Sequence, residues 1–286
     1  MSFAKKFSLF RHTANRIMNQ QWSSVHNAAR TGFTSDSVAK YQRGRPDYPL
    51  DAVNDLLKNV ELPQNGGKIL ELAAGTGKFT RCLAKALAGS DVKIVSSEPS
   101  DAFREKLSDV PSVEVIACAA ESIPLSDSSL DLVIAAQSFH WFANVSALKE
   151  IHRVLKPAKY FAMIWNRIDT SVAWVNHLEY SIISRYYSGS DVPRYVDGKW
   201  SRVFEQFCGF DSLQKSVRSR GIVQEGSKEL IINRVLSISV IASRPEEEQR
   251  KVAAEVEDLL TTHQDTRGLS TYSLPYATDL CWTKKL

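Results

Sequence analysis

Short apolar runs alternate with segments of helical periodicity over the first part of the chain. The runs that predict buried strands are KILEL (68–72), VKIVSSE (92–98), VEVIAC (113–118), SLDLVIAAQ (129–137) and YFAMIW (160–165). Between them, apolar residues recur every three or four positions, which predicts amphipathic helices. Strands that alternate with helices about every 25 to 35 residues indicate βαβ units and a parallel sheet.

The predicted helices have recognisable ends. LDAVNDLLKNV precedes the first strand, and FTRCLAKAL follows it. SDAFREKL predicts a short helix with Ser100 as its N-cap, and SALKEIHRVL predicts one that ends before Pro157.

The chain changes character after the fifth strand. Residues 172–187 and much of 228–260 have helical patterns, whereas LQKSVRSRGI and LPYATDLCWTKKL are typical of late strands. We expect an α/β fold in a single domain over residues 31–286, with a helical insert at about 168–212 that shapes a binding pocket.

The net charge of +4 comes from the N-terminal end. Residues 1–35 contain five basic residues and no acid, so the rest of the chain is close to neutral, and nucleic-acid binding is not expected.

Residues 1–30 are interpreted as a mitochondrial presequence or as a disordered basic tail. The protein is therefore expected inside the cell, in the cytoplasm or, if the presequence works, in mitochondria. It is expected to be a monomer or a homodimer.

Cysteine and histidine spacing implies neither disulfides nor a metal site. The four cysteines form no C-x-x-C pair, which fits a reducing compartment, and the six histidines lack metal-ligand spacing. No apolar stretch reaches the roughly 18 residues that span a bilayer, so membrane association is not expected either.

The stretch ELAAGTGKFT places an acid and two glycines between the first strand and the next helix. A phosphate loop, G-x-x-x-x-G-K-[ST], does not fit, because Leu72 and Phe79 occupy two of its required positions. The nicotinamide fingerprint G-x-G-x-x-G fits halfway. Gly75 and Gly77 match it, but Thr80 replaces the third glycine.

Glu71 discriminates between the remaining ligands. A dinucleotide would place its pyrophosphate at the helix N-terminus, where a carboxylate would repel it. S-adenosylmethionine carries a sulfonium and an ammonium group and no phosphate, so the same carboxylate attracts it. Glu98, at the end of the second strand, could bind the ribose hydroxyls of either ligand. The pattern favours S-adenosylmethionine, with a nicotinamide-dependent oxidoreductase as the alternative.

Several linked motifs resemble those of the class I S-adenosylmethionine-dependent methyltransferases. ELAAGTGKFT resembles the donor-binding turn, SEPS the end of the second strand, ACAAESIPLSDSSLDLV the adenine-contact segment and YQRGRPDYP the amino-terminal lid. AAQSFHWF and EIHRVLKPAKY resemble the fourth strand's end and the next helix, with KPAKY where the family usually has K-P-G-G. The resemblance runs from about His26 to the C terminus and is strongest to the small-molecule branch that includes trans-aconitate-type enzymes.

The resemblance implies a Rossmann-like, seven-stranded, mostly parallel sheet with late antiparallel strands, and a set of donor-binding residues. The expected donor-binding residues are Tyr41, Arg45, Glu71, Ala73, Gly75, Gly77, Glu98, Pro99, Ala120, Glu121 and Gln137. Of these, Ala73 replaces the commoner first glycine. Glu121 is interpreted either as an adenine contact or as a turn cap.

Candidate catalytic and acceptor-binding residues follow the fourth and fifth strands, because open α/β sheets bind ligands at the carboxyl ends of their strands. His140 is a candidate general base or a residue that only lines the site. Trp141 could face the sulfonium through a cation–π contact or pack in the core. Arg167, Arg43 or Arg45 could hold an acceptor carboxylate.

These observations lead to one expected activity, in-line methyl transfer from S-adenosylmethionine to a small-molecule acceptor, which could be a carboxylate. A catalytically inactive donor-binding scaffold protein is the second interpretation.

Overall fold

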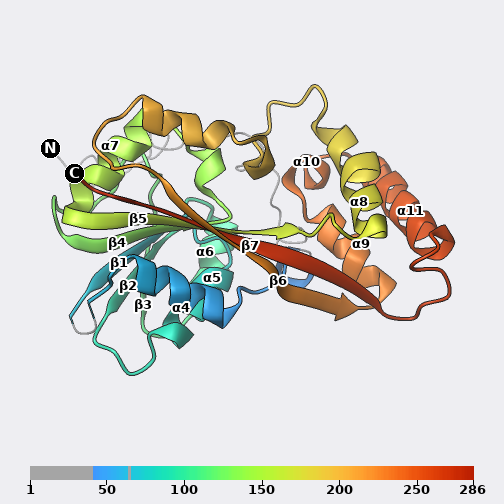
Figure 1. Cartoon of the computed structure of the whole chain (residues 1–286), viewed down its shortest axis with the longest axis horizontal. Coiled ribbons are helices and arrows are strands. Elements are labelled where there is room, and N and C mark those ends of the chain that lie inside the picture. Colours follow the sequence, from blue (N-terminus) through green and yellow to red (C-terminus); the bar gives the residue numbers. More distant parts are fainter. Residues whose placement is uncertain (1–40, 64–65) are drawn as a thin grey trace, which may run out of the picture.

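A seven-stranded sheet forms the centre of the molecule (Figure 1). The computed structural model describes residues 41–63 and 66–286, so the basic segment 1–30 lies outside the described residues. The strand order is β3-β2-β1-β4-β5-β7-β6, and the bounds are β1 Lys68–Leu72, β2 Lys93–Ser97, β3 Val113–Ile116, β4 Leu130–Ala136, β5 Leu155–Ile168, β6 Gln214–Gly226 and β7 Tyr272–Lys284. β1 to β5 are parallel, and β7 is antiparallel to both β5 and β6. The predicted mostly parallel sheet with late antiparallel strands is confirmed.

Helices cover both faces of the parallel part of the sheet. α4 (Leu50–Asn59) and α5 (Lys78–Ala86) share an apolar cluster with one face, and α7 (Val145–Val154) shares a second cluster with the other (Figure 1). The short 3-10 helices η2 (Phe139–Trp141), η5 (Tyr195–Asp197) and η6 (Lys199–Glu205) add aromatic side chains to the second cluster. β1, β2 and β4 are buried from both sides, which explains the apolar residues on both of their faces.

The start of α6 (Asp101–Leu107) differs from the expectation. Ser100 is its N-cap residue, but the Ser100 side chain makes no capping hydrogen bond. Instead, the backbone N–H of Ser100 donates to the Glu98 carboxylate at 2.8 Å. The acid that follows β2 therefore accepts the N–H of the N-cap residue itself, which is a different bond from the one expected of the serine hydroxyl.

A group of helices gathers at one end of the sheet, where β6 and β7 extend (Figure 1). Its members are α8 (Ala173–His177), η3 (Leu178–Ile182), η4 (Ile183–Tyr187), α9 (Lys228–Leu236), α10 (Ser239–Ala242) and α11 (Glu246–Thr262). They share one apolar cluster, in which Trp174, Ile231 and Val256 are buried. The helices before β6 occupy the segment expected as an insert, and those after β6 pack onto them. None of the described helices is long and apolar enough to cross a membrane.

Ala158, in the KPAKY segment where the family usually has K-P-G-G, has an unusual backbone conformation. Ala158 has a φ of 58°, in the left-handed region that favours glycine, and it is exposed. Alanine there costs conformational energy that a glycine would not.

We therefore expect Ala158→Gly to raise the free energy of unfolding by about 0.5–1 kcal/mol, the left-handed penalty less the entropy of a more flexible unfolded chain. Urea denaturation measures the change, and ligand binding should be unaffected because Ala158 does not line the cavity described below. A less stable variant would contradict this account of the backbone at Ala158.

Candidate functional site

A cavity of about 810 Å³ lies at the carboxyl ends of the parallel strands, between the sheet and the helical group. Its wall includes nearly every residue selected from the sequence. Those residues are Tyr41, Arg45, Glu71, Ala73, Gly75, Glu98, Pro99, Ala120, Glu121, Gln137, His140, Trp141 and Arg167. Gly77 and Arg43 are not part of the wall. Helical residues such as Tyr187 and Arg234 close the opposite side.

The turn between β1 and α5 has three residues in the left-handed region. The φ angles are 52° at Ala73, 59° at Gly75 and 79° at Gly77. A Cβ on Gly75 would meet no protein atom within 4 Å, whereas one on Gly77 would lie 3.0 Å from side-chain atoms of Leu107 and Val110. Gly77 is thus the N-cap of α5 packed against its neighbours, and Gly75 faces the cavity.

Glu71 is a fully buried carboxyl group in the cavity wall. Its Oε2 accepts hydrogen bonds from Thr80 Oγ1 at 2.6 Å and from Ser96 Oγ at 3.2 Å. Its Oε1 has no partner among the described residues. Burial raises the pKa of Glu71 to about 8, although the bonds from Thr80 and Ser96 oppose the rise. A cationic ligand beside Oε1 would compensate the buried charge, so the residue fits the sulfonium or ammonium of S-adenosylmethionine. Thr80, which breaks the dinucleotide fingerprint, is the residue that orients this acid.

Glu98 connects the end of β2 to the glycine turn. Its Oε2 accepts the N–H of Gly75 at 2.8 Å, while Oε1 accepts that of Ser100. Burial raises the pKa of Glu98 to about 7, against the lowering effect of these bonds and of Arg104. Each carboxylate oxygen has two lone pairs, so each can still accept from a ribose hydroxyl.

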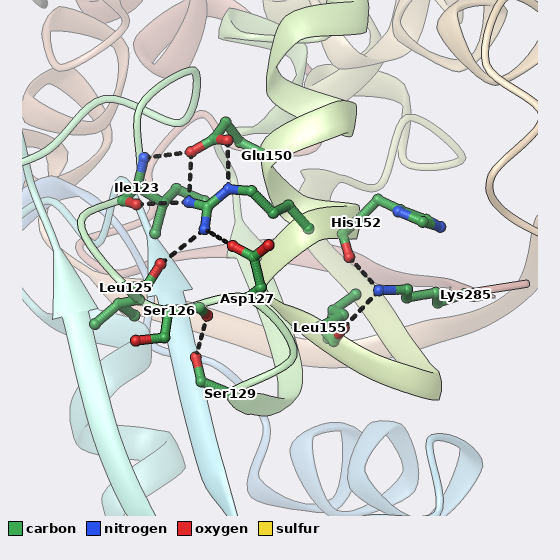
Figure 2. Close-up of polar contacts among 10 residues, drawn as sticks. Ile123, Leu125, Ser126, Asp127, Ser129, Glu150, His152, Leu155 and Lys285 are labelled. Carbon is green, nitrogen blue, oxygen red and sulfur yellow. Dashed lines mark hydrogen bonds and ion pairs between the residues drawn. The ribbon is translucent and has the colours of Figure 1, made fainter.

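Arg153 of α7 holds the predicted adenine-contact loop through hydrogen bonds. Figure 2 labels its partners Ile123, Leu125, Asp127 and Glu150. The Arg153 guanidinium donates to the backbone oxygens of Ile123 and Leu125 and pairs with Glu150 and Asp127. Glu150 in turn accepts the N–H of Ile123 at 2.9 Å. Sequence reasoning missed this network, which holds in place the loop that follows Ala120 and Glu121.

Glu121 lies between the cavity and the N-terminal end of α7, and these contacts test neither its adenine contact nor its role as a turn cap. It lines the cavity, and its carboxylate accepts a 2.8 Å hydrogen bond from Asn144 Nδ2. Asn144 is the N-cap of α7, where its Oδ1 accepts the N–H of Ala147. The adenine contact stays a prediction.

The segment predicted as a lid is attached to three parts of the molecule. Arg45 donates to the side chain and backbone oxygens of Ser237, and Lys78 forms an ion pair with Asp47. Asn166 Nδ2 donates to the Asp47 backbone oxygen. At Gly44, a Cβ would lie 2.7 Å from the backbone oxygen of Asn233, so only glycine allows this approach to α9.

Gln137 links β4 to β5 through its side chain. Its φ is 54°, and its amide group both donates to the backbone oxygen and accepts from the backbone N–H of Asn166. The side-chain amide is thus engaged by the protein, although the residue lines the cavity.

His140 is arranged as a hydrogen-bond donor. Its Nδ1 accepts a 3.2 Å hydrogen bond from Trp165 Nε1. Burial, with the nearby Arg45, lowers the pKa of His140 to about 3. The imidazole is therefore neutral, and its proton is on Nε2. This geometry disfavours the general-base role and favours a hydrogen bond donated to a bound ligand.

Arg167 pairs with the carboxylate of Asp279, which also contacts two other side chains. It contacts Asp279 Oδ2 at 3.3 Å, and the Tyr195 hydroxyl and Lys215 reach the same oxygen at 2.5 and 3.7 Å. Arg167 therefore already has a carboxylate partner within the protein, although Lys215 shares it, and this pairing weakens its case as an acceptor clamp.

The helical side of the wall contains residues that no sequence motif indicated, notably Tyr187, Arg194 and Arg234. They lie beyond the segment with recognisable motifs, and only packing brings them to the cavity. In the described ranges, no cluster of three or more potential metal ligands is present.

Comparison with known sequences connects the chain to methyltransferases. A family model described as a methyltransferase domain matches residues 70–163. An uncharacterised methyltransferase-like protein of Schizosaccharomyces pombe is 37% identical over 252 residues, which cover 86% of this chain and 92% of the relative. An uncharacterised methyltransferase of Mycobacterium tuberculosis is 32% identical over 246 residues, covering 85% and 91%. These descriptions specify no acceptor.

Solved structures share the fold at low identity. A protein of Anaeromyxobacter dehalogenans, described as a type II methyltransferase, superposes with a TM-score of 0.60 at 20% identity, covering 84% of this chain and 97% of that one. Phosphoethanolamine N-methyltransferase 2 of Haemonchus contortus, in complex with S-adenosyl-L-methionine, has a TM-score of 0.54 at 13% identity. It covers 90% of this chain and 58% of its own.

Proposed function

The chain belongs to the class I S-adenosylmethionine-dependent methyltransferase family, and from that premise we propose that it binds S-adenosylmethionine and methylates a small molecule, with a carboxylate as the favoured nucleophile. The observation that carries the proposal is Glu71, whose buried Oε1 is unpartnered in the described part of the cavity wall, beside the glycine turn. A ligand with positive charge at that point lowers the energy of the ionised carboxyl group, and a phosphate would raise it.

S-adenosylmethionine, when bound, supplies an electrophilic methyl group on a positively charged sulfur. The protein contributes alignment of the acceptor and exclusion of water. Trp165 holds His140 so that Nε2–H is the donor available to a ligand. Because His140 is a weak base, the arrangement suits an acceptor that is already ionised at neutral pH, such as a carboxylate.

Calorimetry with S-adenosylmethionine, S-adenosylhomocysteine, NAD and ATP tests the donor assignment, and a screen for methylated metabolites then tests turnover. We expect the two adenosyl sulfur compounds to bind and the phosphate-bearing ligands not to bind. Tight binding of NAD with no response to S-adenosylmethionine would favour the oxidoreductase alternative. Donor binding without any methylated product would favour the inactive scaffold.

We expect Glu98→Ala to weaken S-adenosylhomocysteine binding at least about tenfold, the loss of one or two good hydrogen bonds. Since Glu98 also holds Gly75 and Ser100, part of the loss could come from the turn. The 2′-deoxy analogue of S-adenosylhomocysteine separates the two effects. The wild type should prefer the hydroxylated ligand, and the variant should lose that preference. An unchanged preference would contradict ribose binding by Glu98.

A further inference from the structure

Two arginines in the cavity wall have no carboxylate partner among the described residues. Arg234 is 8% exposed, its Nε donates to the Tyr276 hydroxyl at 3.0 Å, and its Nη1 has no hydrogen-bond partner there. Arg45 donates to Ser237 through Nε at 3.0 Å and through Nη2 at 3.1 Å. Burial, together with the neighbouring Arg234, lowers the pKa of Arg45 to about 10, so it is still charged at neutral pH.

The other two arginines of the wall are paired. Arg167 contacts Asp279, and Arg194 contacts Glu179 at 2.5 Å. A buried guanidinium without a counter-charge is strongly destabilising. Such a charge is retained where a ligand supplies the missing anion.

The location of the pair points to the acceptor side of the cavity. Arg234 belongs to α9 in the helical group, and Ser237, just after α9, fixes Arg45 beside it. Of the residues expected to hold the donor, Glu71 and Glu98 come from the opposite wall, at the ends of β1 and β2. Arg45 was expected among the donor-binding residues too, but its bonds to Ser237 place it on the side of Arg234. S-adenosylmethionine carries two positive groups and one carboxylate, so it cannot neutralise both arginines by itself.

We propose that Arg234, together with Arg45, binds an anionic group of the methyl acceptor, either a carboxylate or a phosphate. This inference rests on the proposed function. A guanidinium forms paired hydrogen bonds with either group, and Nη1 of Arg234 is an available donor for them. The acceptor is accordingly a small anionic metabolite that binds on the side of the cavity where Arg45 and Arg234 lie.

Calorimetric titration with sodium malonate and with inorganic phosphate tests the site, on full-length protein saturated with S-adenosylhomocysteine and at constant ionic strength. The wild type should bind at least one of these anions. Arg234→Met should weaken that binding at least about tenfold. Arg234→Lys should retain part of the affinity, which separates loss of charge from loss of fold.

Arg250→Met is the charge-matched control, because Arg250 is an exposed arginine of α11 that lies outside the cavity wall. Its anion affinity should stay within about threefold of the wild type. The proposal is overturned if the wild type binds neither anion, if Arg234→Met binds as well as the wild type, or if both methionine variants lose affinity equally.

Two further titrations identify the source of the anion. S-adenosylhomocysteine carries a carboxylate, and methylthioadenosine does not. If Arg234→Met weakens binding of the first and spares the second, the anion belongs to the donor, and the acceptor assignment is wrong. Anion titration without S-adenosylhomocysteine tests the arginine pair independently of donor binding. Failure of the proposed function would appear differently, as wild-type protein with no affinity for adenosyl ligands.

Discussion

Glu71→Gln is expected to bind S-adenosylmethionine about 100-fold more weakly than the wild type at pH 8, because an interaction with a buried charge is worth about 2–3 kcal/mol. Glutamine retains an oxygen for Thr80 and Ser96, so the turn should survive. Calorimetry with S-adenosylmethionine and S-adenosylhomocysteine measures the loss, which should be larger for the ligand with the sulfonium. Equal affinity in wild type and variant would remove the electrostatic basis of the donor assignment.

Because of Glu71, the affinity for S-adenosylmethionine should increase with pH. The pKa of Glu71 is raised to about 8 in the folded protein, so below that pH the cationic ligand must first displace a proton. Wild-type affinity, compared with that of Glu71→Gln, should therefore increase from pH 6 to pH 8.

Stability should change in the opposite direction. The folded protein holds the proton of Glu71 more tightly than the unfolded chain does, so this contribution to stability is lost as pH rises from about 4.5 to about 8. In the free protein, Glu71→Gln should therefore gain stability relative to the wild type as pH rises. Urea denaturation at pH 5 and pH 8 provides the control, and a gain that shrinks with pH would contradict the buried carboxyl.

Gly75→Ala and Gly77→Ala should have opposite consequences although the two residues share one turn. An alanine methyl group at Gly75 faces the cavity and meets no protein atom within 4 Å. The fold should lose only about 1–2 kcal/mol for the left-handed backbone, whereas donor affinity should fall about 100-fold or more because the methyl group occupies ligand space.

Gly77→Ala should act mainly on folding. Its methyl group would lie 3.0 Å from side-chain atoms of Leu107 and Val110, at a φ of 79°. We expect a loss of about 2–4 kcal/mol from strain and overpacking, with donor affinity of the folded protein changed far less. Urea denaturation and calorimetry on both variants measure the contrast. If Gly77→Ala lost affinity while keeping stability, the proposed placement of the ligand beside Gly75 would be wrong.

The parallel part of the sheet was predictable because its signals are local. KILEL has three apolar residues in five and SLDLVIAAQ six in nine, since both faces of β1 and β4 are covered. The residues proposed for the donor, such as Gly75 and Glu98, directly follow the ends of such strands. Knowing where a strand ends is therefore almost enough to place them.

The helical part was predictable only as helices. An amphipathic pattern indicates that one face is buried but does not identify its partner. The sequence therefore could not indicate that α9 and α11, which follow β6, would pack with α8 and η3, which precede it. Similarly, Glu150 and Arg153 are typical of an exposed i,i+3 pair until the loop at Ile123 and Leu125 is folded against them.

The sequence by itself determined the sheet, the turn that faces the cavity and the carboxyl groups expected to favour a sulfonium ligand, because each depends on a few neighbouring residues. Tertiary structure alone decided which nitrogen of His140 accepts a hydrogen bond, which arginine pairs with Asp279, and that Arg45 and Arg234 face one cavity. The physical reason is that charge pairing and protonation depend on distances of a few ångströms between residues far apart in the chain, and no local pattern encodes those distances.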